Sequence, residues 1–333
     1  MNHERYLRQT IIPGWNQEKL FSSTAIIVGV GAIGSYVSVL LGASGIGKLV
    51  LIDFDTIEVS NLNRQLLFRD EDIGKSKVEI AAKRLKEINP ELELTYFNNK
   101  MEKVPISVYK KADIIIGCLD TFIGRRWINS LAVRLKKPLI LGGMFAFLGD
   151  VQVIFPYKTP CFECQPLVSE RELAQACTPF GDERKKERKE EKEEEPKLPA
   201  VATMSAIIGG IMAQETLKIL LDIGEPLDNY LFYDGLHNAT TIVKLERNPD
   251  CPACGDVYKL KKVKFAISEK EKVSDLLVRL ALTYGLSNPD ILYKGKLLNK
   301  DITLKEAGIK NNAVVFVIDK NLAKPISVVL EYV

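Results

Sequence analysis

The sequence predicts an α/β protein with a doubly wound parallel sheet, followed by a smaller α+β unit. Short apolar runs typical of buried strands alternate with helical stretches over residues 25–142. Such alternation indicates strand–helix–strand units and therefore a parallel sheet. The glycine-rich segment GVGAIG joins the first run to the first helical stretch, and the pattern changes near residue 258. A chain of 333 residues is long enough for both units.

The elements of the first unit follow from apolar periodicity and from the residues that interrupt it. AIIVGV at 25–30 is rich in β-branched residues and enters the glycine segment, which precedes a helix ending near Ser44. A helix that begins near residue 75 stops at 88, because a proline follows at position 90. Further strands are expected at 48–53, 93–97, 113–117 and 138–142, antiparallel strands at 151–155 and within 230–246, and helices at 126–135 and 200–221.

Residues 258–333 form the second predicted unit. Its expected elements are a strand at 263–267, a helix at 275–284 with Ser274 as N-cap, a strand at 291–293, the turn Lys294-Gly295-Lys296, a strand at 313–318 and an extra strand at 325–332. The change in pattern places the boundary just after Cys254-Gly255. We therefore expect domains at 1–257 and 258–333.

Composition argues against several classes of partner. The 46 basic and 43 acidic residues give a net charge of only +3, so neither nucleic acid nor an acidic membrane is expected. No apolar stretch reaches the length of about 20 residues that crosses a bilayer. MNHERYLRQT lacks the apolar segment of a signal peptide, so we expect a cytoplasmic protein. The fourteen consecutive charged residues of Asp182–Glu195 are interpreted as a solvated surface segment.

The segment Gly29-Val-Gly31-Ala-Ile-Gly34 indicates a nucleotide site. Glycines between a strand and a helix let the backbone approach phosphates at the helix N-terminus. Asp53 ends the next strand, 19 residues after Gly34, where a carboxylate can hold ribose hydroxyls. Taken alone, these features also fit a dinucleotide-binding dehydrogenase.

The residues that follow favour a triphosphate over a dinucleotide. Carboxylate, amide, guanidinium and ammonium groups come soon after the ribose strand: Asp55, Asn61, Arg64, Gln65 and Lys77. Hydride transfer has little use for so much charge, whereas attack at an α-phosphate needs it to neutralise the departing pyrophosphate. Asp120, at the end of a predicted parallel strand, can hold the Mg²⁺ that bridges the phosphates. Arg125 and Arg126, on the next helix, are interpreted as structural or salt-bridged.

Several motifs together carry a resemblance to a known superfamily. RYLRQ at residues 5–9, GVGAIG, DFD with SNLNRQ, GKSK and CLD resemble the Rossmann-like adenylation core of ubiquitin-activating enzymes over about residues 1–250. The same core occurs in bacterial adenylyltransferases of molybdopterin and thiamine synthesis. The roles that this resemblance implies are Asp53 on the ribose of ATP, Asn61, Arg64 and Lys77 on its phosphates, and Asp120 on Mg²⁺. It also implies a homodimer in which Arg8 reaches the site of the other subunit.

Four of the six cysteines form two CxxC pairs, Cys161-Phe-Glu-Cys164 and Cys251-Pro-Ala-Cys254. Four thiolates without histidine are the ligand set of a closed, tetrahedral structural Zn²⁺ site. A redox pair is the alternative interpretation. Cys118 directly follows a predicted strand and is interpreted as core packing.

Cys177 is the predicted nucleophile. It stands outside both CxxC pairs, in a polar segment just before the charged run, where a thiolate can reach a bulky acyl donor. The segment, followed by PAVA at 199–202, resembles the catalytic-cysteine segment of SUMO-type activating enzymes, which implies a thioester on Cys177. Those enzymes insert a helical domain here, whereas this chain has only a loop at about 165–200.

Residues 258–333 resemble ubiquitin, most clearly in ILYKGKLLNKDITLKEAGIKNNAVVFVI, and this implies a β-grasp fold. A fused substrate would need a free Gly-Gly end, which the sequence VLEYV at 329–333 does not offer. We therefore interpret the unit as a docking domain for a conjugating enzyme, because SUMO-type activating enzymes carry a ubiquitin-fold domain directly after a CPxC pair.

The sequence thus predicts an ATP- and Mg²⁺-dependent enzyme that activates a ubiquitin-like protein ending in Gly-Gly. The enzyme would adenylate the C-terminal glycine, form a thioester on Cys177 and pass the thioester to a conjugating enzyme. Two further interpretations stay open. One is an adenylyltransferase for a sulfur-carrier protein in molybdopterin, thiamine or tRNA thiolation, and the other is a non-catalytic nucleotide-binding subunit.

Overall fold

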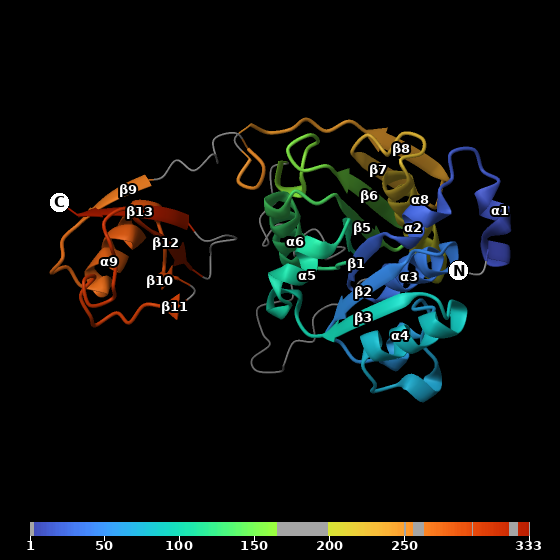
Figure 1. Cartoon of the computed structure of the whole chain (residues 1–333), viewed down its shortest axis with the longest axis horizontal. Helices are drawn as coiled ribbons and strands as arrows, with labels where there is room; N and C mark the ends of the chain where they lie inside the picture. Colours follow the sequence, from blue (N-terminus) through green and yellow to red (C-terminus); the bar gives the residue numbers. More distant parts are fainter. Residues whose placement is uncertain are drawn as a thin grey trace, which may run out of the picture. The chain divides into compact units, whose positions relative to one another are not determined.

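The computed structural model describes residues 3–164, 199–249, 251–255, 263–294, 296–319 and 326–332. The chain divides into two units, Met1–Cys254 and Gly255–Val333 (Figure 1). Each unit has its own sheet and its own hydrophobic core, so we describe them one at a time.

Unit 1 is built on an eight-stranded sheet with the order β3-β2-β1-β4-β5-β6-β7-β8. Strands β1 to β5 are parallel, and β6 to β8 extend the sheet antiparallel. The strands are β1 Thr24–Val28, β2 Lys48–Asp53, β3 Glu93–Asn98, β4 Ile114–Gly117, β5 Leu139–Phe145, β6 Leu148–Ile154, β7 Tyr230–Asp234 and β8 Ala239–Val243. The predicted α/β fold with a largely parallel sheet is confirmed.

Helices cover both faces of this sheet (Figure 1). They are α1 Leu7–Thr10, α2 Gln17–Phe21, α3 Ala32–Ser44, α4 Lys77–Ile88, α5 Ile106–Lys111, α6 Phe122–Leu135 and α8 Ala202–Leu221, with 3₁₀ turns at His3–Tyr6, Val59–Asn61, Asp70–Asp72, Met101–Lys103 and Phe162–Cys164. Successive strand side chains point to opposite faces. Ile27 packs in the core with α3, α4 and α8, whereas Ile26 packs in the core with α5 and α6. The sheet is therefore buried on both sides, as the apolar strand sequences predict.

The strand order reverses next to β1, which lies between β2 and β4. Loops that leave neighbouring strands at such a point diverge and open a crevice at the carboxyl ends of the strands. Here the glycine-rich segment leaves β1 and residues 118–120 leave β4. The fold thus positions the predicted nucleotide residues at one edge of the sheet, which we call the carboxyl edge.

Helix α8 corrects one expectation from the sequence. By length and composition this helix is apolar enough to cross a membrane, although no such stretch was expected. More than half of its apolar window, 56%, is buried within the protein. At Gly209, a Cβ atom would lie 2.7 Å from the Cβ of Tyr36 on α3, so the glycine lets the two helices pack closely. These contacts are typical of a core helix.

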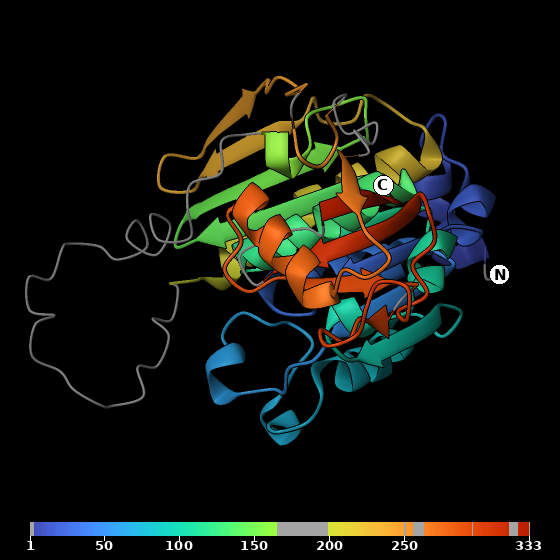
Figure 2. The same ribbon diagram turned by 90° about the vertical axis from the view of Figure 1, so that its left-hand side faces the viewer.

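Unit 2 is a helix packed on a five-stranded sheet with the order β11-β10-β12-β13-β9 (Figure 2). Its elements are β9 Val263–Ile267, α9 Val273–Tyr284, β10 Asp290–Tyr293, β11 Lys296–Leu297, β12 Ala313–Ile318 and β13 Ile326–Tyr332. Strand β13, expected as an extra strand, lies inside the sheet between β12 and β9.

The start of α9 differs from the prediction. The N-cap is Lys272 and not Ser274, so the helix begins with Val273. The Val273 side chain is fully buried, and the Asp275 carboxylate accepts a hydrogen bond from the Lys272 N–H at 3.3 Å. Burial of Val273 and this acidic cap extend the helix past the serine, because capping preference is weaker than core packing.

Candidate nucleotide and zinc sites

The glycine-rich segment forms a tight turn over the end of β4. Gly29 has a positive φ of +88°, and a Cβ atom there would lie 2.4 Å from the Cys118 carbonyl oxygen. A Cβ atom on Gly34 would lie 1.9 Å from the Gly29 carbonyl oxygen. Larger residues are therefore excluded by backbone contacts, and the turn leaves the first N–H groups of α3 at the carboxyl edge. Free N–H groups at a helix N-terminus bind phosphate well.

Asp53 is held beside this turn by two backbone donors. Its Oδ2 accepts a hydrogen bond from the Val30 N–H at 2.7 Å, and its Oδ1 accepts one from the Asp55 N–H at 2.9 Å. Burial raises the pKa of Asp53, while these bonds and the charge of Lys77 lower it. Each carboxylate oxygen keeps a lone pair for another donor, so the group can accept hydrogen bonds from ribose hydroxyls.

Lys77 and Asp55 form an ion pair next to Asp53. The Lys77 Nζ lies 2.9 Å from the Asp55 Oδ2, and the lysine side chain is nearly buried. Lys77 is the first residue of α4, and its N–H donates to the Asp55 carbonyl at 3.1 Å. A second helix N-terminus with a fixed ammonium group therefore adjoins the ribose carboxylate, which suits a chain of phosphates.

Three predicted site residues belong to the segment SNLNRQ, and their environments differ. Asn61 is buried, and its Oδ1 accepts from the Glu58 N–H at 3.1 Å, so part of its role is to cap a turn. Arg64 is half-buried and donates to the Ser60 carbonyl at 2.6 Å. Gln65 is 5% exposed, and its Nε2 would lie 3.7 Å from a Cβ atom on Gly31. The amide of Gln65 therefore borders the glycine turn, and its Oε1 has no hydrogen-bond partner among the described residues.

Asp120 follows β4 at the same edge. The Cys118 N–H continues the ladder by donating to the Val28 carbonyl at 2.8 Å, and Leu119 contacts the position of a Gly29 side chain. The Asp120 carboxylate is exposed, and no described residue pairs with it. It can therefore bind a hard cation such as Mg²⁺. Burial raises the pKa of the Cys118 thiol to about 12, which makes it a poor nucleophile.

Among the predicted nucleotide-site residues in the described chain, Arg8 lies away from the carboxyl edge. Its neighbour Gln9 donates to the Ser44 carbonyl at 2.6 Å, and Tyr6 accepts from Asn89 at 3.0 Å. Ser44 and Asn89 are at the C-terminal ends of α3 and α4. A helix of the length of α3 spans about 20 Å. Arg8 is thus separated from the glycine turn of its own subunit by about the length of this helix.

The two CxxC pairs come together as one cluster. The four Sγ atoms lie within 4.8 Å of one another, and all four residues are buried. The Sγ atoms of Cys161 and Cys251 are 3.5 Å apart, and those of Cys164 and Cys254 are 3.3 Å apart. Hydrogen bonding from Cys161 lowers the pKa of Cys251 and lowers that of Cys164 to about 7. Four converging, buried sulfurs can hold a tetrahedral Zn²⁺.

Helix α6 supports this cluster through residues that the sequence did not single out. The Asn129 Nδ2 lies 3.6 Å from the Cys161 Sγ, and its Oδ1 accepts from the Phe162 N–H at 3.1 Å. Glu163, inside the first CxxC pair, is buried, accepts from the Ser130 hydroxyl at 2.9 Å and lies 3.6 Å from Arg126. Arg126 is therefore salt-bridged, as interpreted. No local pattern marks Asn129, because its partners are 32 and 33 residues away.

Most of this chain matches one known protein family, and several known proteins resemble it. Residues 3–253, about three quarters of the sequence, match the ThiF family. The chain belongs to the ThiF family. The sulfur carrier protein adenylyltransferase of Thermus thermophilus is 32% identical over 76% of this chain and 91% of the relative. The NEDD8-activating enzyme E1 catalytic subunit of Caenorhabditis elegans is 29% identical over 84% of this chain and 80% of the relative.

A solved structure of Escherichia coli MccB with ATP has the same fold as this ThiF chain. The TM-score is 0.63 with 27% identity, over 76% of this chain and 75% of MccB. The prediction of an adenylating-enzyme superfamily with ATP as its nucleotide is confirmed. The individual roles of the ThiF site residues stay predictions.

Cys177 lies outside the described residues, but the described residues on either side of its segment lie near the carboxyl edge. The Ala146 N–H, in the turn between β5 and β6, donates to the Pro199 carbonyl at 2.8 Å. Ala146 and Ala200 form a parallel bridge. On the other side of the loop, the Phe162 ring lies 5.0 Å from the ring of Phe122, the first residue of α6. Both flanks of the loop therefore approach the edge that holds the nucleotide residues.

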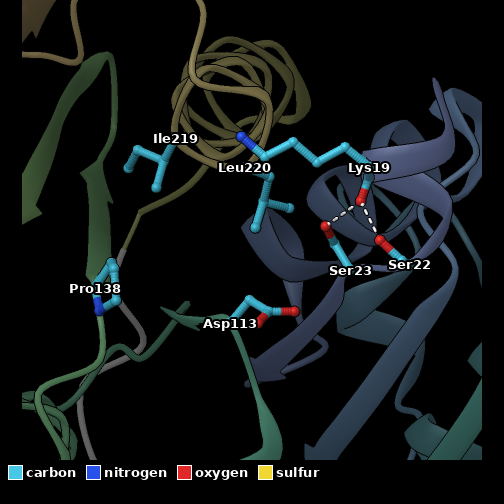
Figure 3. Close-up of a pocket in the computed structure, with 7 residues that line it drawn as sticks. All are labelled: Lys19, Ser22, Ser23, Asp113, Pro138, Ile219 and Leu220. Carbon is cyan, nitrogen blue, oxygen red and sulfur yellow. Dashed lines mark hydrogen bonds between the residues drawn. The ribbon is translucent and has the colours of Figure 1, made fainter. Parts of the chain in front are cut away.

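A separate cavity of about 380 Å³ opens at the other end of the ThiF sheet (Figure 3). It is lined by Lys19, Ser22, Ser23, Asp113, Pro138, Ile219 and Leu220. Asp113 and Pro138 directly precede β4 and β5, so the cavity adjoins the amino ends of these parallel strands. The hydroxyls of Ser22 and Ser23 both donate to the Lys19 carbonyl, at 2.9 and 2.7 Å. Its location excludes this cavity as the predicted nucleotide site.

Proposed function

We propose that this chain activates a ubiquitin-like protein that ends in Gly-Gly. The C-terminal carboxylate of the partner attacks the α-phosphate of ATP, and pyrophosphate leaves. The Cys177 thiolate then attacks the acyl carbon, AMP leaves, and the resulting thioester passes to a conjugating enzyme. The carboxylate is already ionised at neutral pH, so the first step requires positioning and charge neutralisation and no general base.

The observation that carries this proposal is the grouping of phosphate-directed groups at the carboxyl edge. Two helix N-termini, the Lys77 ammonium and the buried Asp53 carboxylate surround the switch point of the sheet. When bound there, Mg²⁺ would neutralise phosphate charge and be held by Asp120. This set of groups matches a departing pyrophosphate better than a nicotinamide, because hydride transfer releases no anion.

We propose further that the enzyme is a homodimer with shared sites. Arg8 has no hydrogen-bond or ion-pair partner among the described residues, and α3 separates it from the glycine turn of its own subunit. The neighbouring side chains Leu7, Ile11 and Ile12 are 56%, 74% and 46% exposed. Apolar side chains around an unpaired arginine suit burial against a second copy, in which Arg8 would face the phosphates.

Chain length permits Cys177 to reach the adenylate. It lies 13 residues after Cys164 and 22 residues before Pro199. An extended chain covers about 3.5 Å per residue, so the shorter arm can span about 45 Å. Since both flanks of the loop approach the carboxyl edge, no movement of the sheet is required for the thiol to meet the acyl-adenylate.

We assign docking of the conjugating enzyme to unit 2. The two NEDD8-activating relatives from Caenorhabditis elegans and Schizosaccharomyces pombe match 84% and 81% of this chain, more than the 76% matched by the Thermus thermophilus adenylyltransferase. The longer matches favour an activating enzyme. The 91% coverage of the Thermus thermophilus relative favours the second candidate, adenylation of a sulfur-carrier protein.

Intact-mass analysis tests the proposal and separates the two candidates. The enzyme would be incubated with Mg·ATP and with purified Gly-Gly-ending proteins from the same genome. We expect a covalent adduct that is released by thiols, formed by wild type and absent in Cys177→Ala. Pyrophosphate exchange into ATP should persist in Cys177→Ala, because adenylation needs no thiol. An acyl-adenylate without any thiol-sensitive adduct would instead support the sulfur-carrier function.

A further inference from the structure

The loop that carries Asp120 is tied to the sheet by a side chain from the next helix. Arg125 lies in the first turn of α6, and its Nε donates to the Leu119 carbonyl at 2.9 Å. Its Nη2 donates to the Gly142 carbonyl on β5 at 3.2 Å. Its Nη1 lies 3.8 Å from the Asp150 Oδ2 on β6. One guanidinium group therefore connects the residue before Asp120 to two neighbouring strands.

The residues around this guanidinium leave space for it and offset its positive charge. A Cβ atom on Gly143 would lie 2.2 Å from the Arg125 Nη2 and 2.7 Å from the Asp150 Oδ1, so a larger residue there would displace the guanidinium or the carboxylate. The helix dipole disfavours a positive charge in the first turn of α6. Two carbonyls and the Asp150 carboxylate offset that cost. Burial raises the pKa of Asp150, and the charge of Arg125 opposes the rise.

Asp120 has no comparable support of its own. Its carboxylate is exposed and unpaired among the described residues, so the backbone of the loop sets the positions that it can reach. That backbone is fixed at one end by the bond from Cys118 to β1. At the other end the Thr121 hydroxyl caps α6 by accepting from the Gly124 N–H at 3.2 Å. Leu119 lies between these anchors, and its carbonyl is the group that Arg125 binds.

We propose that Arg125 is a positioning residue for Asp120. By holding the Leu119 carbonyl against β5, it fixes the loop so that the Asp120 carboxylate is presented to the Mg²⁺ of bound ATP. This inference rests on the proposed function, which assigns Asp120 to the metal. It goes beyond the structural role that the sequence indicated, since a purely structural arginine would stabilise unit 1 without changing metal dependence.

Titration calorimetry with ATP tests the inference without any partner protein. The Kd of ATP would be measured with excess Mg²⁺ and with EDTA for wild type, Asp120→Ala, Arg125→Lys and the double variant. We expect Mg²⁺ to tighten binding by wild type and not by Asp120→Ala. Arg125→Lys keeps the positive charge but loses the planar guanidinium group that binds two carbonyls at once. The factor by which Mg²⁺ tightens ATP binding should be about tenfold smaller in this variant than in wild type. Its Kd in EDTA should equal that of wild type.

Two further variants separate positioning from folding. Gly143→Ala changes no polar group but crowds the guanidinium, so it should reproduce the loss seen in Arg125→Lys. Asp150→Asn leaves both carbonyl bonds of Arg125 in place and should keep the Mg²⁺ effect. The double variant should bind Mg·ATP no more weakly than Asp120→Ala, since both changes remove the same interaction.

The inference is overturned if Arg125→Lys keeps the full Mg²⁺ effect, or if the effects of Arg125→Lys and Asp120→Ala add. Equal binding of ATP by wild type in Mg²⁺ and in EDTA would overturn it together with the metal role of Asp120. A wild-type chain that binds no ATP under either condition would count against the proposed function itself, and the two failures are therefore distinguishable.

Discussion

Lys77 is nearly buried, and its ammonium group forms an ion pair with Asp55 at 2.9 Å and also acts on the charge of Asp53. The sequence identified both residues as site residues but could not show that they pair. Gly29, Gly34 and Asp53 could be predicted because they belong to one strand–turn–helix–strand unit with fixed spacing. Arg125 is interpreted from the sequence as structural or salt-bridged, but its bonds to the Leu119 and Gly142 carbonyls could not be predicted, because a sequence motif does not identify backbone acceptors.

Replacement of Lys77 by methionine tests the phosphate role at this scale. Methionine keeps most of the side-chain volume and removes the charge that would neutralise pyrophosphate. We expect partner-dependent pyrophosphate exchange to fall by about a hundredfold or more, as for other single transition-state contacts. Lys75→Met is the matched control, because Lys75 is half exposed and lies 3.6 Å from Asp72. Equal activity of the two variants would remove Lys77 from the phosphate site.

At the scale of elements, the zinc cluster shows which structural features could be predicted from sequence patterns and which could not. The two CxxC pairs predicted four ligands, and the structure brings them together although their members are 90 residues apart. The patterns did not reveal that α6 supports the cluster through Asn129 and Ser130. Helix boundaries were also less predictable than helix positions, since α9 begins at Val273 because that side chain packs in the core of unit 2.

Replacement of one cysteine tests whether the cluster binds Zn²⁺. We expect about one Zn²⁺ per chain, and Cys251→Ser should lower the melting temperature by about 10 °C because metal binding stabilises only the folded state. Cys118→Ser should keep the zinc content, since Cys118 is outside the cluster. Metal analysis together with calorimetry measures both quantities. A zinc-free preparation with the wild-type melting temperature would contradict the assignment.

A second prediction concerns the contribution of strand β13 to the folding of unit 2. It pairs with β12 on one side and β9 on the other, and Val328 and Leu330 are fully buried. Deletion of residues 326–333 should therefore unfold unit 2 and leave unit 1 folded. Limited proteolysis should degrade residues 263–319 in the deletion variant and spare the core. The same digestion of a variant with Lys264→Ala, which removes only a surface ion pair, should resemble wild type.

At the scale of the whole molecule, the length of α3 decides which residues can share a site. This 13-residue helix has the glycine turn at its N-terminal end and the anchor of the Arg8 segment at its C-terminal end. The sequence motif RYLRQ implied a role for Arg8 in the partner subunit. In the fold these two features lie at opposite ends of α3, which agrees with our proposal that the Arg8 of one subunit serves the site of the other.

Subunit mixing tests this arrangement. Arg8→Ala and Lys77→Met homodimers should each be inactive in pyrophosphate exchange. After unfolding and refolding of an equal mixture, the mixed dimers contain one intact site, and random pairing should restore about a quarter of wild-type activity. If the mixture stays inactive, Arg8 acts within its own subunit. Light scattering of the wild-type chain checks that dimers are present.

The order of strands in unit 2 also has a consequence for the way the protein is made. Strand β13 lies in the interior of the sheet, between β12 and β9. It follows β9, α9, β10, β11 and β12 in the chain, so all of these elements are synthesised before it. While residue 332 is still inside the ribosome, β9 has no neighbouring strand on which to pair, and β12 is an open edge. Unit 1 can fold during translation, whereas unit 2 can acquire its native sheet only after residue 332 has emerged. Any docking function of unit 2 therefore begins after that point in synthesis.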